Sequence, residues 1–274
     1  MVYINDVPFG TRNFPNGETI FDIDKQYTRD AQNTIKLVYE SDADIFRLIM
    51  AKKCLDAEIR RCKVHNGHRY GFVTLHIAYM PYSRMDRQMP TMAFTLKYFA
   101  EVINSLNFDS VTILTPHSNV TPALINNVNV IYDTGISEAY EDSNPSYVFY
   151  PDNGACKSFG EHLKYTNYFY GNKKRELLTG KIEKYELVNA PDINGKNILI
   201  IDDLCVKGGT FILAAQALKA AGAAKVDLFV THLEKAVYEG ELLMTDLVDH
   251  IYTVNTLEIP IKSNKITEVR GDYV

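Results

Sequence analysis

The chain has 274 residues, of which 46% are hydrophobic and 23% charged, a composition that is ordinary for a globular protein of one or two domains. Its formal net charge of −5 argues against nucleic-acid binding, which requires a basic surface. We expect neither a secretory signal nor a membrane span, and the four cysteines form no C-x-x-C pair, so reduced thiols in a cytoplasmic protein are predicted.

The first half of the chain predicts strands and helices in alternation. Strands are expected over residues 33–40, 69–81 and 109–117, which are rich in β-branched and other apolar residues. Apolar residues recur at helical spacing over 42–63 and 91–106. A β-α-β-α-β order of this kind is typical of an α/β domain with a mainly parallel sheet.

The second half repeats the pattern. Strands are predicted over residues 146–154, 167–175, 196–203 and 225–232, the second of them ending in a basic loop. A helix is predicted over 211–223, where a glycine near the end favours termination.

Both halves therefore predict an α/β architecture in which a mainly parallel sheet is flanked by helices. We expect the boundary between the halves near residues 132–145. On this basis residues 1–133 are assigned to the first domain and residues 134–274 to the second.

The segment 198–218 is the most informative in the chain. An apolar strand ends in Asp202 and Asp203, a tight loop contains two glycines, and a helix is expected to open at Thr210. The carboxyl edge of an open α/β sheet is where ligands bind, and free N–H groups at a helix N-terminus favour a phosphate. Two upstream carboxylates can hold ribose hydroxyls or a metal ion. These parts suit a sugar that carries a phosphate.

This segment resembles the phosphoribosyl-pyrophosphate-binding motif that type I phosphoribosyltransferases share with ribose-phosphate pyrophosphokinases. The resemblance implies two phosphoribosyltransferase-like domains, of which the second binds a 5-phosphorylated ribose. It assigns this ligand to Asp202, Asp203, Val206, Lys207, Gly208, Gly209 and Thr210. A plain strand–turn–helix unit is the alternative, and the segment alone does not separate enzymes that use the activated sugar from those that make it.

Two segments in the first half resemble ATP-binding elements of the pyrophosphokinases. FPNGE (14–18) is similar to an element that reaches the adenine-nucleotide site of a neighbouring subunit, which implies a homo-oligomer. YMPYSRMDRQ (79–88) is similar to an arginine-containing segment that binds the triphosphate. The resemblance assigns ATP to Phe14, Asn16, Glu18, Arg84, Met85, Asp86 and Arg87. A hairpin turn and a solvated charged loop are the alternatives.

Three further segments resemble the metal-binding and catalytic elements of that family. TPH (115–117) implies that His117 is a metal ligand, and YPDNG (150–154) implies the same for Asp152, with Mg²⁺ as the ion. NKKRE (172–176) implies that Lys173 and Arg175 are catalytic, because positioned cations neutralise the charge that develops in phosphoryl transfer. Alone, His117 could be structural and NKKRE a basic surface loop.

The resemblance implies transfer of pyrophosphate from ATP to the anomeric hydroxyl of ribose 5-phosphate, with release of AMP. Val206 and Lys207 stand where the family carries an acidic residue and a threonine, so a more positive phosphate loop is expected. This departure leaves open a nucleotide-linked ribose such as ADP-ribose as the acceptor, a reaction that would belong to NAD metabolism. Cys205, in the same loop, could be reactive or a small buried filler.

Two other classes of protein remain open. A phosphoribosyltransferase would share residues 198–218, but it would not call for FPNGE or the arginine segment. A non-catalytic regulatory relative would be compatible with the substitutions, although Lys173 and His117 argue against it.

Overall fold

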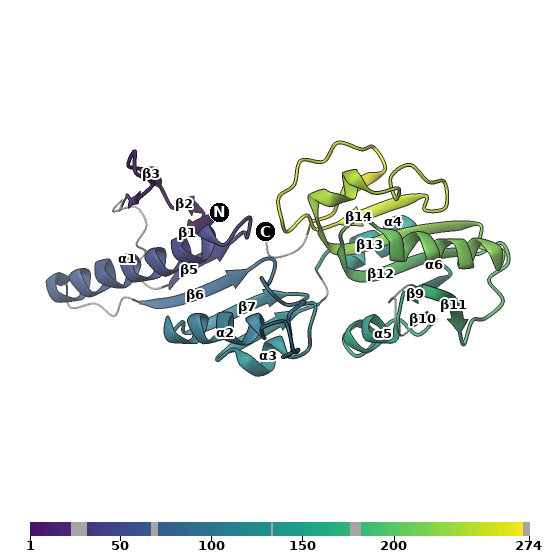
Figure 1. The fold of residues 1–274 in the computed structure, drawn as a ribbon, viewed down its shortest axis with the longest axis horizontal. Helices are drawn as coiled ribbons and strands as arrows, with labels where there is room; N and C mark the ends of the chain where they lie inside the picture. Colours follow the sequence, from purple (N-terminus) through teal and green to yellow (C-terminus); the bar gives the residue numbers. More distant parts are fainter. Residues whose placement is uncertain (23–31, 67–70, 133, 176–181, 271–274) are drawn as a thin grey trace. The chain divides into compact units, whose positions relative to one another are not determined.

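The computed structural model describes residues 1–22, 32–66, 71–132, 134–175 and 182–270, with the side chains of 62–66, 173–175 and 182–184 outside the description. The chain folds as two compact units, Met1–Ile131 (unit 1) and Tyr132–Val274 (unit 2). Each unit has its own main sheet (Figure 1) and its own hydrophobic core. The assignment of residues 1–133 and 134–274 to separate functional domains stays a prediction.

Unit 1 contains a six-stranded sheet in the order β2-β1-β5-β6-β7-β8. Strands β5 to β8 run parallel, whereas β1 and β2 are antiparallel. The strands are β1 (Val2–Ile4), β2 (Val7–Pro8), β5 (Gln32–Leu37), β6 (Phe72–Ile77), β7 (Ser110–Leu114) and β8 (Val128–Ile131). In β5 every second residue is buried, as expected where side chains alternate between the two faces of a sheet.

The helices of unit 1 are α1 (Ala43–Asn66), α2 (Thr95–Ser105) and the short α3 (Thr121–Leu124). At the start of α1, buried Asp44 accepts hydrogen bonds from the backbone N–H groups of Glu40 and Ser41. Helix α2 buries residues at helical spacing against the sheet: Leu96, Phe99, Ala100 and Ile103.

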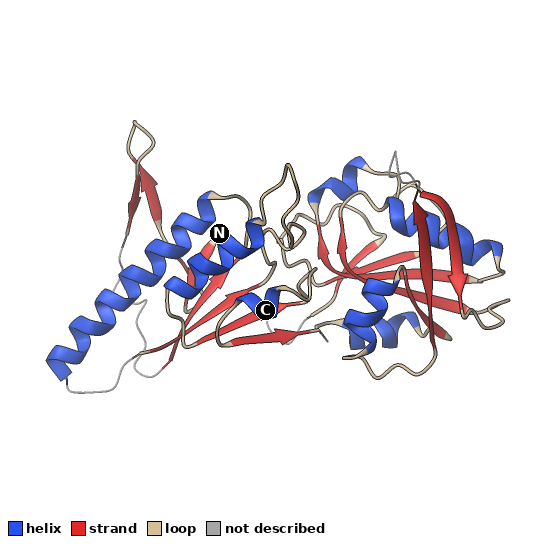
Figure 2. Ribbon diagram, turned by 60° about the horizontal axis from the view of Figure 1, so that its bottom comes forward, coloured by secondary structure: helices blue, strands red, loops and turns tan. Residues whose placement is uncertain are grey.

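A two-stranded hairpin, β3 (Thr11–Asn13) and β4 (Thr19–Phe21), projects from unit 1 as a separate ribbon (Figure 2). The ring of Phe21 stacks on that of Phe9, with 5.6 Å between centroids, and meets the edge of Phe46 on α1. Aromatic packing therefore holds the base of the hairpin, while its tip extends outward.

Unit 2 contains a seven-stranded sheet in the order β11-β10-β9-β12-β13-β14-β15. All neighbouring strands are parallel except β10 and β11, which are antiparallel. The strands are β9 (Tyr147–Tyr150), β10 (Tyr168–Arg175), β11 (Ile182–Val188), β12 (Asn197–Cys205), β13 (Lys225–Leu233), β14 (His250–Thr253) and β15 (Ile266–Glu268).

The helices of unit 2 are α4 (Ile136–Ser143), α5 (Asn153–Gly160), α6 (Gly209–Ala220) and the 3₁₀ helix η2 (Lys235–Glu239). Gly222 follows α6 with φ +95°, the left-handed geometry that ends many helices. The core of unit 2 is rich in residues of the central strands β12 and β13, which are nearly continuous apolar runs because both faces of a parallel sheet are covered.

These observations confirm the predicted α/β fold with mainly parallel sheets flanked by helices, and they correct several boundaries. The strand predicted to end at residue 203 continues to Cys205, since Leu204 and Cys205 still pair with β13. The strand predicted over 109–117 ends at Leu114, and the helix predicted from residue 91 starts at Thr95. Among the described residues, no helix combines the length and the apolar character that crossing a lipid bilayer requires.

Candidate functional site

Three carboxyl groups of unit 2 lie close enough to interact: Asp152 after β9, and Asp202 and Asp203 within the last part of β12. The backbone N–H of Asp203 donates to Oδ1 of Asp202 at 3.0 Å. Burial, followed by the negative charges of Asp203 and Asp152, raises the pKa of Asp202 well above that of an ordinary carboxyl group. Hydroxyl donors or a divalent cation would relieve this repulsion.

Asp152 also begins helix α5. Its extended backbone and its side chain, which accepts from the N–H of Ala155 at 3.0 Å, make it the N-cap residue. The cap turns the chain sharply after β9 and fixes Asp152 at the carboxyl edge of the sheet. One residue therefore serves both the helix and the acidic cluster.

A tyrosine that the sequence analysis did not identify supports this loop. The hydroxyl of Tyr185, on β11, donates to the carbonyl of Pro151 at 2.8 Å. The Tyr185 side chain lies near the acidic cluster. Burial, and then the charges of Asp152 and Asp202, therefore raise its pKa. Gly171 on β10 makes room, because a side chain there would collide with the Tyr185 hydroxyl and approach the Pro151 carbonyl to 2.9 Å.

The predicted phosphate loop follows directly. Gly208 adopts φ +82°, and a Cβ atom at this position would lie 2.5 Å from Leu242. It precedes the first residue of α6, Gly209, so the helix opens one residue earlier than predicted. Within the described chain, no side-chain hydrogen bond caps this helix end. Its N–H groups and helix dipole therefore suit an anion.

Lys207, within this loop, and Cys205, directly before it, have different environments. The ammonium of Lys207 lies 3.1 Å from a carboxylate oxygen of Glu239, the last residue of η2. The Cys205 thiol is buried in the core of unit 2, where burial raises its pKa to about 12. A thiol of this kind is an apolar filler rather than a nucleophile.

In unit 1 the predicted triphosphate loop is tied to the loop that carries His117. The hydroxyl of Ser118 donates to Oδ2 of Asp86 at 2.8 Å, and Nε of Arg87 donates to Oδ1 of Asp86 at 2.9 Å. Both loops leave the carboxyl ends of neighbouring parallel strands, β6 and β7. Arg84, Arg87 and His117 are exposed, so their side chains face solvent at the edge where α/β sheets bind ligands.

Two bulky residues near these loops have left-handed backbone conformations: Tyr82 at φ +61° and Thr115 at φ +36°. Such values are strained for residues other than glycine, and strain of this kind clusters at functional sites. The Tyr82 hydroxyl donates to Asp42 at 2.5 Å, and the Tyr39 hydroxyl donates to the same oxygen at 2.6 Å. These bonds hold the start of the arginine loop against the N-terminal end of α1.

The FPNGE segment forms the tip of the β3–β4 hairpin. The N–H of Phe14 donates to the carbonyl of Glu18 at 2.8 Å, and Asn16 donates to the Glu18 carboxylate at 2.9 Å. Phe14 is 51% exposed, which is unusual for so large an apolar side chain and is compatible with contact to another molecule.

The predicted catalytic residues Lys173 and Arg175 belong to β10, in agreement with the strand predicted over 167–175. Their backbones pair with Tyr185 and Ile182 of β11, with a register shift between Lys174 and Arg175. The side chains of residues 173–175 lie outside the described part of the chain. The predicted strand is thus confirmed, while the catalytic role stays a prediction.

The predicted metal ligands do not form a ready-made cage. His117 lies in unit 1 and Asp152 in unit 2. Within the described ranges, no group of three or more histidine, cysteine, aspartate or glutamate side chains is arranged to hold a metal ion.

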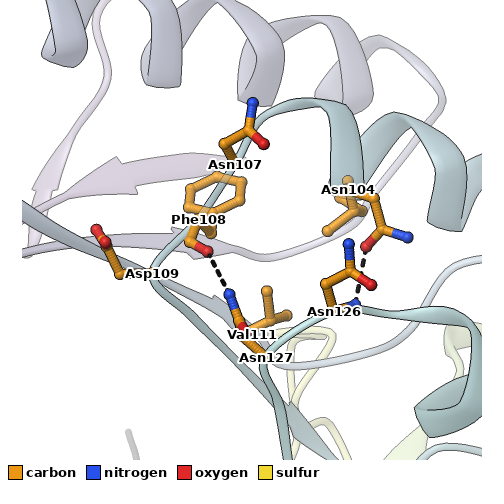
Figure 3. A pocket seen from close by; sticks show the side chains of 8 residues that line it. Asn104, Asn107, Phe108, Asp109, Val111, Asn126 and Asn127 are labelled. Carbon is orange, nitrogen blue, oxygen red and sulfur yellow. Dashed lines mark hydrogen bonds between the residues drawn. The ribbon is translucent and has the colours of Figure 1, made fainter.

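Two cavities lie away from the predicted site. One, of about 300 Å³, lies at the amino-terminal edge of the unit 1 sheet, where asparagines hold the turns around β7 (Figure 3). Asn104 donates to the Leu124 carbonyl at 2.8 Å and Asn127 to the Phe108 carbonyl at 3.2 Å. The other, of about 410 Å³, lies between residues 243–250 and 263–265 of unit 2. None of the predicted site residues lines either cavity.

The fold and the strand–loop–helix at residues 202–210 define a type I phosphoribosyltransferase-like protein. The family model of the phosphoribosyl transferase domain matches residues 164–258. A crystal structure of phosphoribosylpyrophosphate synthetase from Mycobacterium smegmatis superimposes with a TM-score of 0.72 at 18% identity, covering 96% of this chain and 86% of that one.

Curated relatives agree with this class. The ribose-phosphate pyrophosphokinase of Sulfurisphaera tokodaii is 28% identical over 266 residues, 93% of this chain and 86% of the relative. That of Thermoplasma acidophilum is 24% identical over 270 residues, 96% of this chain and 88% of the relative. Over most of its length the chain is therefore similar to ribose-phosphate pyrophosphokinases, which supports an enzyme of the transferase class.

Proposed function

We propose that this enzyme transfers the pyrophosphate group of ATP to the anomeric hydroxyl of ribose 5-phosphate and releases AMP. The observation that carries the proposal is the acidic cluster of unit 2 directly upstream of an anion-binding helix end. Asp202 and Asp203 supply acceptors for ribose hydroxyls, and residues 206–210 supply the N–H groups for the 5-phosphate. The 1-hydroxyl then attacks the β-phosphorus of ATP in line, and the bond between the α–β bridging oxygen and the β-phosphorus breaks.

ATP is assigned to residues of unit 1. Arg84 and Arg87 pair with triphosphate oxygens, a task that suits the planar fork of a guanidinium group. Met85 and Asp86 belong to the same loop, in which Asp86 orients Arg87 through the 2.9 Å hydrogen bond. The hairpin tip contacts the adenine of ATP that is bound to a second copy of the chain in a homo-oligomer, through Phe14, Asn16 and Glu18. The exposure of Phe14 supports this role.

The chemistry of the carboxylates suits a divalent cation such as Mg²⁺, although the described side chains form no complete metal cage. Carboxylate oxygens are its preferred ligands, and the pKa of Asp202 is raised by burial and by neighbouring negative charge that a cation would offset. Asp152 and His117 are the residues assigned to metal. When bound, Mg²⁺ would supply charge neutralisation at phosphate and hydroxyl oxygens.

The proposed acceptor is ribose 5-phosphate rather than ADP-ribose. The case for a nucleotide-linked ribose depended on extra positive charge at Lys207, and Glu239 balances that charge at 3.1 Å. No specific observation favours a phosphoribosyltransferase or a regulatory protein. The cytoplasmic location stays a prediction.

An assay of AMP release tests the proposal. Purified protein with Mg²⁺ is offered, in separate reactions, ATP with ribose 5-phosphate, ATP with ADP-ribose, or a nucleobase with phosphoribosyl pyrophosphate and no ATP. We expect AMP only with ribose 5-phosphate. AMP with ADP-ribose alone would change the acceptor, nucleotide formed without ATP would indicate a phosphoribosyltransferase, and no product in any reaction would favour a regulatory protein.

Lys173 provides the first prediction. Replacing it with alanine should lower turnover by about 10²- to 10³-fold, the range for loss of one positioned electrostatic donor, with the thermal unfolding temperature unchanged. Lys174→Ala is the matched control, because it removes the same charge one residue along the same strand. Equal turnover in the two variants would remove the catalytic role of Lys173.

A further inference from the structure

The loop that follows β13 is built against the proposed phosphate loop. The backbone N–H of Glu234 donates to the carbonyl of Cys205 at 2.8 Å, which joins the start of η2 to the end of β12. Gly240 lies so close to the Lys207 carbonyl that a side chain there would collide with it. Leu242 packs on Gly208, where a Cβ atom would come within 2.5 Å of it. Residues 234–242 therefore form one wall of the phosphate loop.

Glu239 is the charged residue that this wall presents to Lys207. The two side chains are 59% and 69% exposed, at a separation of 3.1 Å. An ion pair with this much exposure is weak, because water screens it and two long side chains must be held in place. Lys207 can therefore leave Glu239 for a phosphate oxygen at little cost, but the carboxylate of Glu239 stays beside the loop.

We propose that Glu239 is a specificity-determining residue, which selects acceptors that end in a single 5-phosphate. This inference rests on the proposed function, since it takes residues 206–210 as the phosphate site. A terminal phosphate can bind the free N–H groups of α6 and draw Lys207 towards it. A longer, diphosphate-linked substituent brings a second negative phosphate group to this loop, and Glu239 repels that added charge.

This proposal accounts for the departure seen in the sequence. A lysine at position 207 by itself makes the loop more positive, which would favour acceptors of higher charge. With Glu239 beside it the two charges cancel, so discrimination depends on where the negative charge of the acceptor lies rather than on its total.

The test compares Glu239→Gln with the wild-type chain by titration calorimetry, with ribose 5-phosphate and ADP-ribose as probes. We expect Glu239→Gln to bind ADP-ribose about two- to five-fold more tightly than wild type, the range that one exposed charge produces, and to bind ribose 5-phosphate with a smaller change. The gain should shrink as salt is raised from 20 to 300 mM, roughly across the range in which charges at this distance become screened. Glu239→Asp, which keeps the charge, should restore wild-type discrimination.

Glu241→Gln is the matched control, since it removes an equal charge two residues along, from an exposed side chain. If Glu241→Gln changes the ratio of the two affinities as much as Glu239→Gln, the effect is that of net charge and the proposal is overturned. Wild-type binding of ribose 5-phosphate with an unchanged ratio in Glu239→Gln overturns the role of Glu239 and leaves the proposed function standing. Failure of the wild-type chain to bind ribose 5-phosphate overturns both.

In steady-state assays of AMP release with ribose 5-phosphate, Glu239→Gln should show a small change in KM and a kcat within about two-fold of wild type, because its charge acts on binding rather than on the reacting phosphorus. A fall in kcat with an unchanged KM would contradict a role in acceptor selection.

Discussion

Asp202 is a single side chain whose requirements for folding and for ligand binding oppose each other. In the protein without ligands its carboxyl group is desolvated and lies near two other carboxylates, which raise its pKa. A ligand that donates hydroxyl hydrogen bonds or brings positive charge removes this cost. The residue is therefore destabilising in the empty site and favourable in the occupied one, as is common for functional residues.

The sign of the pH dependence follows from the raised pKa. In the unfolded chain Asp202 loses its proton near pH 4, whereas in the folded chain it keeps the proton up to a higher pH. Between these two values the folded state binds more protons, so its stability falls as pH rises, and the loss is complete above the folded pKa. Asp202→Asn should remove this loss and therefore stabilise the metal-free protein relative to wild type at a pH above the folded pKa.

Thermal unfolding of Asp202→Asn and wild type at pH 4, 6 and 8, with a chelator present, measures this difference. We expect the advantage of the variant to grow with pH and its affinity for ribose 5-phosphate to fall. If the variant is less stable than wild type at pH 8, the Asp202 carboxylate stabilises the folded protein and the prediction is wrong.

Among short elements, the α5 cap allows two roles of Asp152 to be separated. The Asp152→Asn variant keeps an N-cap acceptor, because asparagine caps helices as well as aspartate does, while Asp152→Ala removes the cap and should cost about 1 kcal/mol of stability. Both variants lose the charge assigned to metal. We expect Asp152→Asn to unfold at the wild-type urea concentration and yet to lose AMP-forming activity, whereas full activity in that variant would exclude a metal ligand at this position.

The two glycines of the phosphate loop differ in a way that gives another prediction. Gly208 has φ +82° and is covered by Leu242, whereas a Cβ atom at Gly209 would meet open space. Gly208→Ala should destabilise the protein by about 1–3 kcal/mol, the cost of a strained backbone together with a steric clash. Gly209→Ala should have little effect on stability, within about 1 kcal/mol. Urea unfolding of both variants checks this, and equal losses would mean that the loop rearranges around residue 208.

The long elements can be predicted from sequence because their patterns are strong. Helix α1 is predicted over 42–63 and found at Ala43–Asn66, and the predicted end of the strand at the acidic pair lies within two residues of the observed one. The strand predicted over 167–175 is found at Tyr168–Arg175, but its antiparallel pairing with β11 is a tertiary effect that the local pattern does not contain. Helix α5 is only eight residues long and contains two glycines, so its periodicity is too weak to detect.

The candidate site shows the same division. Asp202, Asp203 and the two glycines can be found from sequence, because acid–acid followed by glycine–glycine after an apolar strand has a local physical meaning. Tyr185 and Glu239 cannot, because each reaches the site from a separate segment of the chain. For Tyr185 a signal exists in Gly171, since glycine within a strand often marks a close approach of other atoms.

At the scale of the whole molecule, each unit has its own hydrophobic core. Leu75 is fully buried in the core of unit 1 and Leu228 in that of unit 2. Replacing either with alanine leaves a cavity and should cost about 2–5 kcal/mol. We expect Leu75→Ala to speed amide hydrogen exchange in β5, β6 and β7, and Leu228→Ala to do so in β12 and β13. Mass spectrometry of peptides locates the change, and acceleration spread equally over both units by one variant would show that they unfold as one body.

Gly171 limits which substitutions the enzyme can accept during evolution. The Tyr185 hydroxyl reaches the backbone just ahead of Asp152 only because position 171 has no side chain. A methyl group added there would displace the tyrosine ring, and the displacement would reach the acidic cluster although no charged residue had been altered. The effect of a mutation in this protein therefore depends on more than its distance from the reacting groups. Because Gly171 on β10 has no side chain, Tyr185 can support the loop that positions the Asp152 carboxylate.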